Sequence, residues 1–141
     1  MESKAKAVWK GSLKEGQGII STDSGVLSNV PYTFKTRFEG AKGTNPEELV
    51  AAAHSACFSM ALSAELGKAK ITPESVEANA AVVLTQSSGG FSVSESRLTA
   101  VVTAPGADRT EIEKAAAGAK ENCPISKLLN AKISLDLTIN T

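Results

Sequence analysis

The stretch that decides the fold is residues 45–67, NPEELVAAAHSACFSMALSAELG. Asn45 is typical of a helix N-cap, Pro46 of the first helical position, and Glu48 of the third position in a capping box. A glycine commonly follows the last turn of a helix, so the predicted helix ends before Gly67.

The middle of this predicted helix, residues 49–62, is almost entirely small or apolar. A helix on the surface of a domain would carry a polar stripe, so we expect this helix to be buried nearly all round. A chain of 141 residues offers little material to cover such a central helix. The composition therefore predicts a homodimer in which a second chain completes the cover.

Three short strands are predicted before the helix, over residues 5–10, 17–22 and 26–38. The period of two places the aromatic side chains of the third strand on one face and Arg37 on the other. Pro31 is typical of an edge strand or a bulge rather than a central strand.

Strands and helices also alternate after the helix. In chain order these are strands 76–84 and 91–104 joined by a hairpin turn, a helix 108–121, a short helical turn 125–129, and a strand 133–139. Because strands meet as hairpins rather than through repeated crossovers, the order favours an α+β fold: antiparallel strands wrapped around a long buried central helix, plus a second helix.

Composition narrows the class of protein. Residues 1–141 fit a single domain, and 42% hydrophobic against 21% charged residues exclude a disordered tail. Fifteen Lys and Arg balance fifteen Asp and Glu, so we expect neither nucleic acid nor an acidic membrane as a partner. No secretory signal and no long apolar run are recognisable, so we expect a cytoplasmic protein.

Cys57 and Cys123 are the strongest chemical candidates. A thiol inside an apolar helix is mostly protonated, so Cys57 by itself is either a packing residue or a nucleophile with a cationic partner. Cys123 precedes Pro124, where a new helical turn would present N–H groups to a thiolate, although simple packing explains it equally well. The spacing excludes a Cys-x-x-Cys loop, which leaves a reaction in which one thiolate attacks and the other resolves.

Four polar residues could assist a thiol. His54 precedes Cys57 by one turn, as a base, a metal ligand or, most simply, a packed polar residue; three potential ligands do not predict a metal site. Arg37 is either solvated or a stabiliser of a thiolate. Glu47 and Glu48 complement the helix dipole and the cap, and either of them could also orient Arg37. Glu47 lies about 15 Å from Cys57 along a straight helix, so a shared site needs Arg37 as a bridge, a bend or a second subunit.

The motifs resemble a known family. The segments that carry the resemblance are Arg37-Phe38-Glu39-Gly40, Gly43-Thr44-Asn45-Pro46-Glu47-Glu48-Leu49, Ala52-Ala53-His54-Ser55-Ala56-Cys57-Phe58-Ser59-Met60-Ala61-Leu62 and Asn122-Cys123-Pro124-Ile125-Ser126. Together they closely resemble the OsmC family of osmotically inducible peroxidases, and the OsmC branch more than the organic hydroperoxide resistance branch.

The resemblance implies an intertwined homodimer that reduces hydroperoxides, organic ones in preference to hydrogen peroxide. By residue match, Cys57 is the peroxidatic thiolate, Cys123 the resolving thiol, Arg37 the residue that activates the thiolate, and Glu47 its orienting carboxylate. It implies no haem, no metal and no bound cofactor. The reductant would be an external dithiol or a lipoylated protein.

Two other classes of function remain open on the sequence. One is a small-molecule binding domain whose cysteines only pack. The other is a redox-sensing or stress-protective binding protein that uses the same disulfide as a signal, without sustained turnover. A peroxidase has one thiol that reacts at a pH well below the usual thiol pKa, whereas a binding domain with packing cysteines does not. Sustained turnover distinguishes a peroxidase from a redox-sensing protein.

Overall fold

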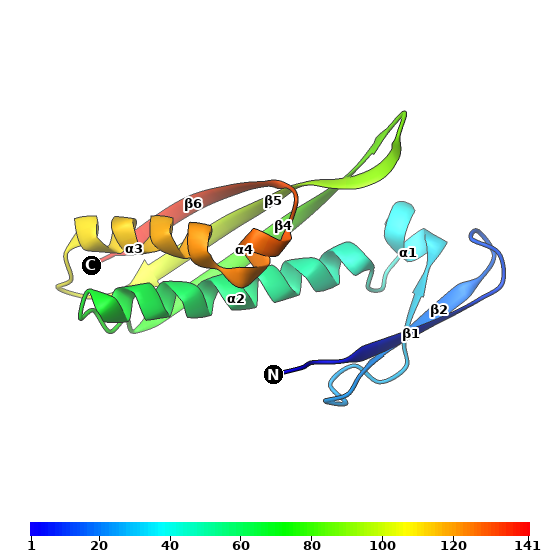
Figure 1. The fold of residues 1–141 in the computed structure, drawn as a ribbon, viewed down its shortest axis with the longest axis horizontal. Helices are drawn as coiled ribbons and strands as arrows, with labels where there is room; N and C mark the ends of the chain where they lie inside the picture. Colours follow the sequence, from blue (N-terminus) through cyan, green and yellow to red (C-terminus); the bar gives the residue numbers. More distant parts are fainter. The chain divides into compact units, whose positions relative to one another are not determined.

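The computed structural model describes residues 1–141 and divides into two compact units, Met1–Leu49 and Val50–Thr141 (Figure 1). Each unit has its own three-stranded sheet, one in the order β1-β2-β3 and the other in the order β4-β5-β6. Helices and strands are both present in substantial number, which confirms the predicted α+β class.

The first unit is a small antiparallel sheet with one short helix. Its elements are β1 (Ala5–Lys10), β2 (Gln17–Thr22), β3 (Val30–Thr33) and α1 (Phe34–Phe38). The rings of Trp9 and Tyr32 lie 5.4 Å apart between their centroids. Both rings lie directly beside Gly18, where a Cβ atom would collide with them. Gly18 is the one buried residue of this unit, so the sheet has no apolar core of its own.

The predicted strand 26–38 is wrong at both ends, because β3 covers only Val30–Thr33. Strand β3 ends at Thr33, and the next five residues form α1 because Thr33 and Thr36 cap each other. The Thr33 hydroxyl accepts the N–H of Thr36 at 3.2 Å, and the Thr36 hydroxyl accepts the N–H of Thr33 at 2.9 Å. Arg37 therefore lies on a helix rather than on a strand face. The predicted edge position of Pro31 is confirmed, since β3 is an edge strand.

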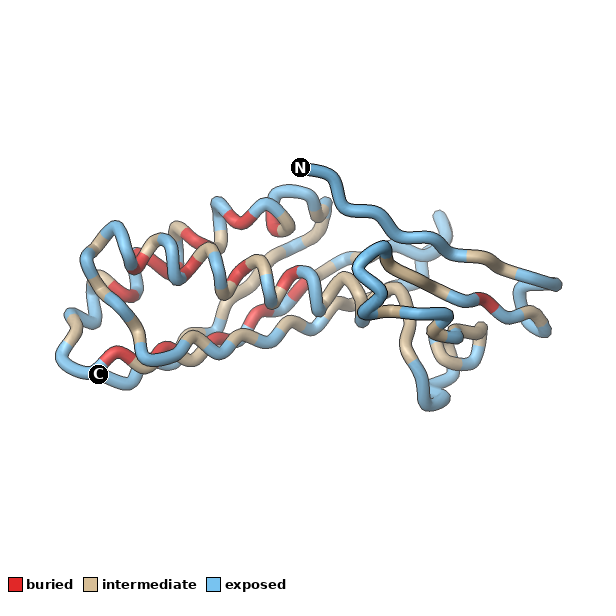
Figure 2. Tube along the Cα trace, turned by 90° about the horizontal axis from the view of Figure 1, so that it is seen from below, coloured by how far each residue is buried: buried red, intermediate tan, exposed pale blue.

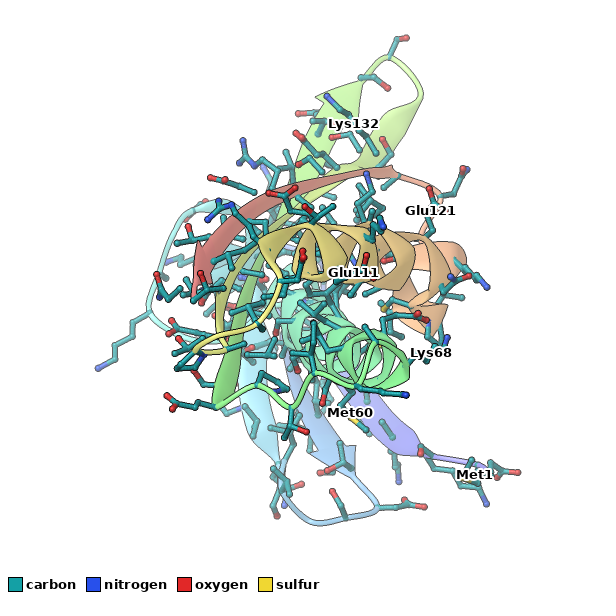
Figure 3. The ribbon with its side chains drawn as sticks, turned by 90° about the vertical axis from the view of Figure 1, so that its left-hand side faces the viewer. Met1, Met60, Lys68, Glu111, Glu121 and Lys132 are labelled. Atoms are coloured by element: carbon teal, nitrogen blue, oxygen red, sulfur yellow. The ribbon has the colours of Figure 1, made fainter.

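The second unit packs two helices on one face of a sheet, as Figures 1 and 3 show. Its elements are most of α2 (Pro46–Lys68), then β4 (Ser75–Ser87), β5 (Gly90–Thr103), α3 (Arg109–Asn122), α4 (Pro124–Leu128) and β6 (Lys132–Asn140). Strands β4 and β5 form the predicted antiparallel hairpin. The β5–β6 pair is parallel, which corrects the expectation of antiparallel strands throughout. Helices α3 and α4 lie between β5 and β6 in the chain and make the crossover that a parallel pair requires.

Helix α2 buries one face only. Its buried residues are His54, Phe58, Leu62 and Leu66, which recur every four positions and face the core formed with β5 and α3 (Figure 2). The opposite face is exposed, with 74% of Met60 accessible. The expectation of burial nearly all round is therefore not met within one chain, because one sheet and one helix cover only one side of α2.

Because one of its faces is exposed, α2 is unusually apolar for a helix at a protein surface. An 18-residue window of this helix has a mean hydropathy of 1.4, which by length and composition alone suits a membrane span. The expectation that the chain has no long apolar run is corrected by this helix. The contacts of its other face with the core are those of a core helix in a soluble domain.

Candidate active site

The two cysteines meet in the second unit. Cys57 lies on α2, and Cys123 both ends α3 and begins α4, with Pro124 at the first helical position as predicted. Their sulfur atoms are 2.9 Å apart, and both are free thiols. Cys123 is fully buried, whereas Cys57 is half-buried. The structure therefore places side by side the two thiols that the sequence pairs only by elimination.

The environment of the pair affects the two thiols in opposite directions. Burial raises the pKa of Cys57, the hydrogen bond with Cys123 raises it further, and the N–H of Ile125 opposes this only in part. Burial also acts to raise the pKa of Cys123, but hydrogen bonds from Cys57, from the backbone and hydroxyl of Ser126, and from the backbone of Ile125 outweigh it. The pKa of Cys123 is consequently lowered.

The first unit contains an arginine–carboxylate pair. The single N–H of Arg37 Nε is shared between Oε1 and Oε2 of Glu47, at 3.3 and 3.2 Å, and Nη2 donates to Oε1 at 2.8 Å. The guanidinium also lies 5.1 Å from the ring centroid of Phe38. No hydrogen bond within the chain uses Arg37 Nη1. Arg37 is therefore oriented by Glu47 and keeps N–H groups available for a second anion.

Local capping explains why Glu47 is free to bind Arg37. The N–H of Glu48 donates to the Asn45 side chain at 2.9 Å, which confirms the predicted helix start. The carboxylate of Glu48 accepts the Thr44 hydroxyl at 2.8 Å instead of completing a capping box. The Asn45 amide also donates to the carbonyl of Thr36 at 3.3 Å, which ties α1 to the start of α2.

His54 has neither of the chemical roles considered from the sequence. It is completely buried, with Nδ1 2.7 Å from the Ser96 hydroxyl and Nε2 2.8 Å from the Ser126 hydroxyl. Both ring nitrogens are thus occupied, and neither is free for a metal ion or for a direct bond to Cys57. No group of three or more His, Cys, Asp or Glu side chains is placed to hold a metal.

Ser96 and Ser126 were not predicted as site residues, although the position of each in the sequence is unusual for a serine. Ser96 has the same parity as Leu98 and Ala100 on the inward face of β5, so it is a polar residue in an apolar row. Ser126 follows Cys123 by three positions across the start of α4, where its side chain returns to the same corner. A buried hydroxyl requires a hydrogen-bond partner, and the single histidine of the chain provides it for both.

The remaining arginines have ordinary surroundings, as expected. Arg97 lies on the exposed face of β5. Arg109 begins α3 and forms an exposed ion pair with Glu113 at 3.3 Å. The structure therefore brings the four candidate residues together as two pairs, one in each unit.

Comparison with known proteins adds relatives along the whole chain. The family described as OsmC-like protein matches residues 39–138. Peroxiredoxin OsmC of Escherichia coli is 47% identical over 141 residues, covering 100% of this chain and 99% of that protein. Organic hydroperoxide resistance protein OhrB of Bacillus subtilis is 32% identical over 123 residues, covering 86% and 88% of the two chains.

Solved structures agree with these sequence matches. A crystal structure of an organic hydroperoxide resistance protein OsmC from Legionella pneumophila superposes with a TM-score of 0.74 and 28% identity, over 100% of this chain and 98% of that one. The crystal structure of OhrB from Bacillus subtilis gives a TM-score of 0.71 at 32% identity, over 95% and 97% of the two chains.

Proposed function

The chain belongs to the OsmC family, and we propose that Cys57 and Cys123 carry its chemistry as the attacking and the resolving thiol. It is a thiol-dependent hydroperoxide reductase, a peroxidase of the peroxiredoxin type. The observation that carries the residue assignment is the 2.9 Å separation of two free thiols. Two such thiols in contact are the arrangement that a two-cysteine peroxidase needs.

In the proposed reaction the Cys57 thiolate attacks the distal oxygen of the hydroperoxide. The O–O bond breaks, an S–O bond forms, and the leaving oxygen takes up a proton and departs as an alcohol, so Cys57 becomes a sulfenic acid. Cys123 then attacks that sulfur, the S–O bond breaks, and water leaves as the disulfide forms. An external dithiol or a lipoylated protein reduces the disulfide and restores both thiols.

Cys57 needs a cation for this role, because its surroundings in the second unit raise its pKa. We assign that cation to Arg37, whose Nη1 has no partner within the chain and whose orientation Glu47 fixes. Each unit by which the guanidinium lowers the pKa of the Cys57 thiol stabilises the thiolate over the thiol by about 1.4 kcal/mol. Arg37 would also stabilise the negative charge that develops on the leaving oxygen.

The working unit that we propose is a homodimer. Two observations support it: the exposed apolar face of α2, and a first unit in which every residue except Gly18 is at least partly exposed. A second copy of the chain would cover both surfaces, and it offers a second source of Arg37 for each Cys57. Exposed apolar patches of this kind mark association surfaces in soluble proteins.

The proposed substrates are organic hydroperoxides, with hydrogen peroxide reduced less well. Residues 1–141 would act as one functional domain in the cytoplasm, without a bound cofactor and without nucleic acid or membrane partners. The names of the relatives support the preference for organic substrates, since several are organic hydroperoxide resistance proteins.

Consumption of cumene hydroperoxide with excess dithiothreitol tests the proposal. We expect the wild-type protein to turn over many equivalents, Cys57→Ser to consume none, and Cys123→Ser to reduce about one equivalent per chain before it slows. Full turnover by Cys57→Ser would reverse or remove the assignment. A wild-type protein that stops after one equivalent despite excess dithiol would instead be a redox sensor rather than an enzyme.

A further inference from the structure

The two sulfur atoms of the candidate site differ in their access to solvent. Cys123 is fully buried, whereas Cys57 is partly exposed, although their sulfurs lie only 2.9 Å apart. The position of Cys57 on α2 explains this difference, because Cys57 lies at the border between the buried face, which contains Phe58, and the exposed face, which contains Met60. A reagent that comes from solvent therefore meets Cys57 first.

Cys123 is held at the corner between α3 and α4 by hydrogen bonds on both sides. Its N–H donates to the carbonyl of Ala119 at 2.9 Å, and its carbonyl accepts the N–H of Lys127 at 3.0 Å. Ser126 ties α4 to α2, since its hydroxyl lies 2.8 Å from Nε2 of the buried His54. Exposing the sulfur of Cys123 would require this corner to open and these hydrogen bonds to break.

Association with a second chain cannot reverse the difference in access. A second chain can only add cover, and Cys123 is already fully buried by its own chain. Cys57 must remain accessible in the working protein, because the hydroperoxide has to reach it in the proposed function. The difference in access is therefore a property of the folded chain itself.

We propose that the external reductant attacks the disulfide at the sulfur of Cys57 and not at the sulfur of Cys123. The proposal rests on the function given above and deepens it, since it states which sulfur the reductant contacts. The rate of thiol–disulfide exchange depends on which sulfur is attacked and on the access to that sulfur. Closing the disulfide from 2.9 Å needs less than about 1 Å of movement, so Cys123 stays within its corner in the oxidised chain.

In this step a thiolate of the reductant attacks the sulfur of Cys57. A new S–S bond joins the reductant to Cys57, the bond between Cys57 and Cys123 breaks, and Cys123 leaves as a thiolate that takes up a proton. The second thiol of a dithiol then attacks the reductant's own sulfur, so Cys57 leaves as a thiolate and the dithiol becomes a disulfide. Two electrons pass from the dithiol to the protein, and no other reagent enters.

Attack at Cys123 would give a different intermediate. The reductant would then be joined to a sulfur that has no exposed surface, inside the corner between α3 and α4, and Cys57 would be the free thiol. The two intermediates differ in which cysteine carries the reductant. Peptide mapping of a trapped mixed disulfide therefore distinguishes them.

The first measurement starts from wild-type protein oxidised to the internal disulfide with diamide, so that no step of the peroxidase reaction is needed. Glutathione, a monothiol, is added in excess for a short time, and free thiols are then blocked with N-ethylmaleimide at mildly acidic pH. Peptide mass mapping should find glutathione on Cys57 in preference to Cys123 by at least about tenfold, with the maleimide on Cys123. Glutathione mainly on Cys123, or equally on both cysteines, would overturn the proposal.

The same oxidised protein in concentrated urea is the matched control, because unfolding gives both sulfurs similar access. Glutathione should then be found on Cys57 and Cys123 in similar amounts. A preference for Cys57 that persists unchanged in urea would show that the fold does not set it, and would also overturn the proposal.

A second measurement does not require the mixed disulfide to accumulate. Cys57 in Cys123→Ser and Cys123 in Cys57→Ser are each modified with methyl methanethiosulfonate and with its bulkier benzyl analogue. Because both reagents react with the same thiolate, the ratio of their rates reports access and not the pKa of the thiol. The benzyl reagent should match the methyl reagent within about threefold on Cys57 and be at least about tenfold slower on Cys123. Equal ratios for the two cysteines would contradict the difference in access.

These measurements fail independently of the proposed function. A protein that consumes no cumene hydroperoxide but takes glutathione on Cys57 would lose the peroxidase assignment and keep the direction of attack on the disulfide. A protein that turns over cumene hydroperoxide but takes glutathione on Cys123 would remain a peroxidase, and the proposed direction of attack would be wrong.

Discussion

The sulfur of Cys123 lies 2.9 Å from the sulfur of Cys57, although 66 residues separate the two cysteines in the chain. A disulfide requires an S–S distance of about 2.05 Å, so closure needs less than about 1 Å of movement. The buried core residues Phe58, directly after Cys57, and Ala119, one helical turn before Cys123, can remain packed while the bond forms and breaks. The site is therefore arranged for an internal disulfide.

Loss of Cys123 should expose Cys57 to over-oxidation. In Cys123→Ser the sulfenic acid has no thiol within reach, and excess peroxide converts it to sulfinic and sulfonic acids. Intact-mass analysis after several equivalents of cumene hydroperoxide should show two or three added oxygen atoms on this variant and a simple disulfide on the wild-type protein. An equally over-oxidised wild-type protein would contradict internal resolution by Cys123.

Removal of the Arg37–Glu47 pair should slow the formation of the sulfenic acid on Cys57 and not the formation of the disulfide with Cys123. Arg37→Lys loses the bidentate geometry and Glu47→Gln loses the charge that orients it, so each should lower the rate of sulfenic acid formation at least about tenfold. Stopped-flow measurement with cumene hydroperoxide checks this. Arg97→Lys, on the exposed face of β5, is the control and should behave as wild type. A normal rate in Arg37→Lys would remove the guanidinium from the mechanism.

A large charged side chain on the exposed face of α2 should prevent dimer formation. Ala53 of α2 and Ala117 of α3 are both exposed alanines within helices, so Ala53→Arg and Ala117→Arg form a matched pair. Size-exclusion chromatography with light scattering should give a dimer for the wild-type protein and for Ala117→Arg, and a monomer for Ala53→Arg. A monomeric wild-type protein, or a dimeric Ala53→Arg, would count against the proposed interface.

Acid should destabilise the fold through His54. Burial lowers the pKa of His54 from its usual 6.5, so the unfolded chain binds more protons than the folded one below that pH. The stability that the neutral imidazole contributes is complete above about pH 6.5 and is lost as pH falls towards the folded pKa. Thermal unfolding should show a steeper fall between pH 6.5 and 5 for the wild-type protein than for His54→Gln. Identical slopes would contradict a buried neutral His54.

The sequence is sufficient to predict most of the architecture. The cap at Asn45, the hairpin turn at residues 87–90 and the corner at Pro124 are local signals that the structure retains. Helix α1 was missed because alternating aromatic residues suggested a strand, while the reciprocal cap of Thr33 and Thr36 is a weaker pattern that depends on both hydroxyls. The parallel direction of β5 and β6 was not predicted, because it depends on which end of the sheet the connection through α3 and α4 returns the chain to.

Only part of the candidate site can be predicted from the sequence. The residues alone predicted that Glu47 or Glu48 could orient Arg37, and the family resemblance selected Glu47, which does bind Arg37. The contact of Cys57 with Cys123 depends on how α3 packs on α2, and no spacing rule encodes it. The hydrogen-bond partners of His54 are Ser96, 42 residues away, and Ser126, 72 residues away. Partners so distant in the chain cannot be predicted from the residues around His54.

The central claim is that Cys57, rather than Cys123, takes the oxygen from the peroxide. The pKa of Cys57 is raised whereas that of Cys123 is lowered, so this assignment is a demanding one. Dimedone trapping with peptide mass mapping, after one equivalent of cumene hydroperoxide, tests it directly in Cys57→Ser and Cys123→Ser. The account predicts a dimedone adduct on Cys57 in Cys123→Ser and none on Cys123 in Cys57→Ser; an adduct formed as rapidly on Cys123 in the absence of Cys57 would contradict it.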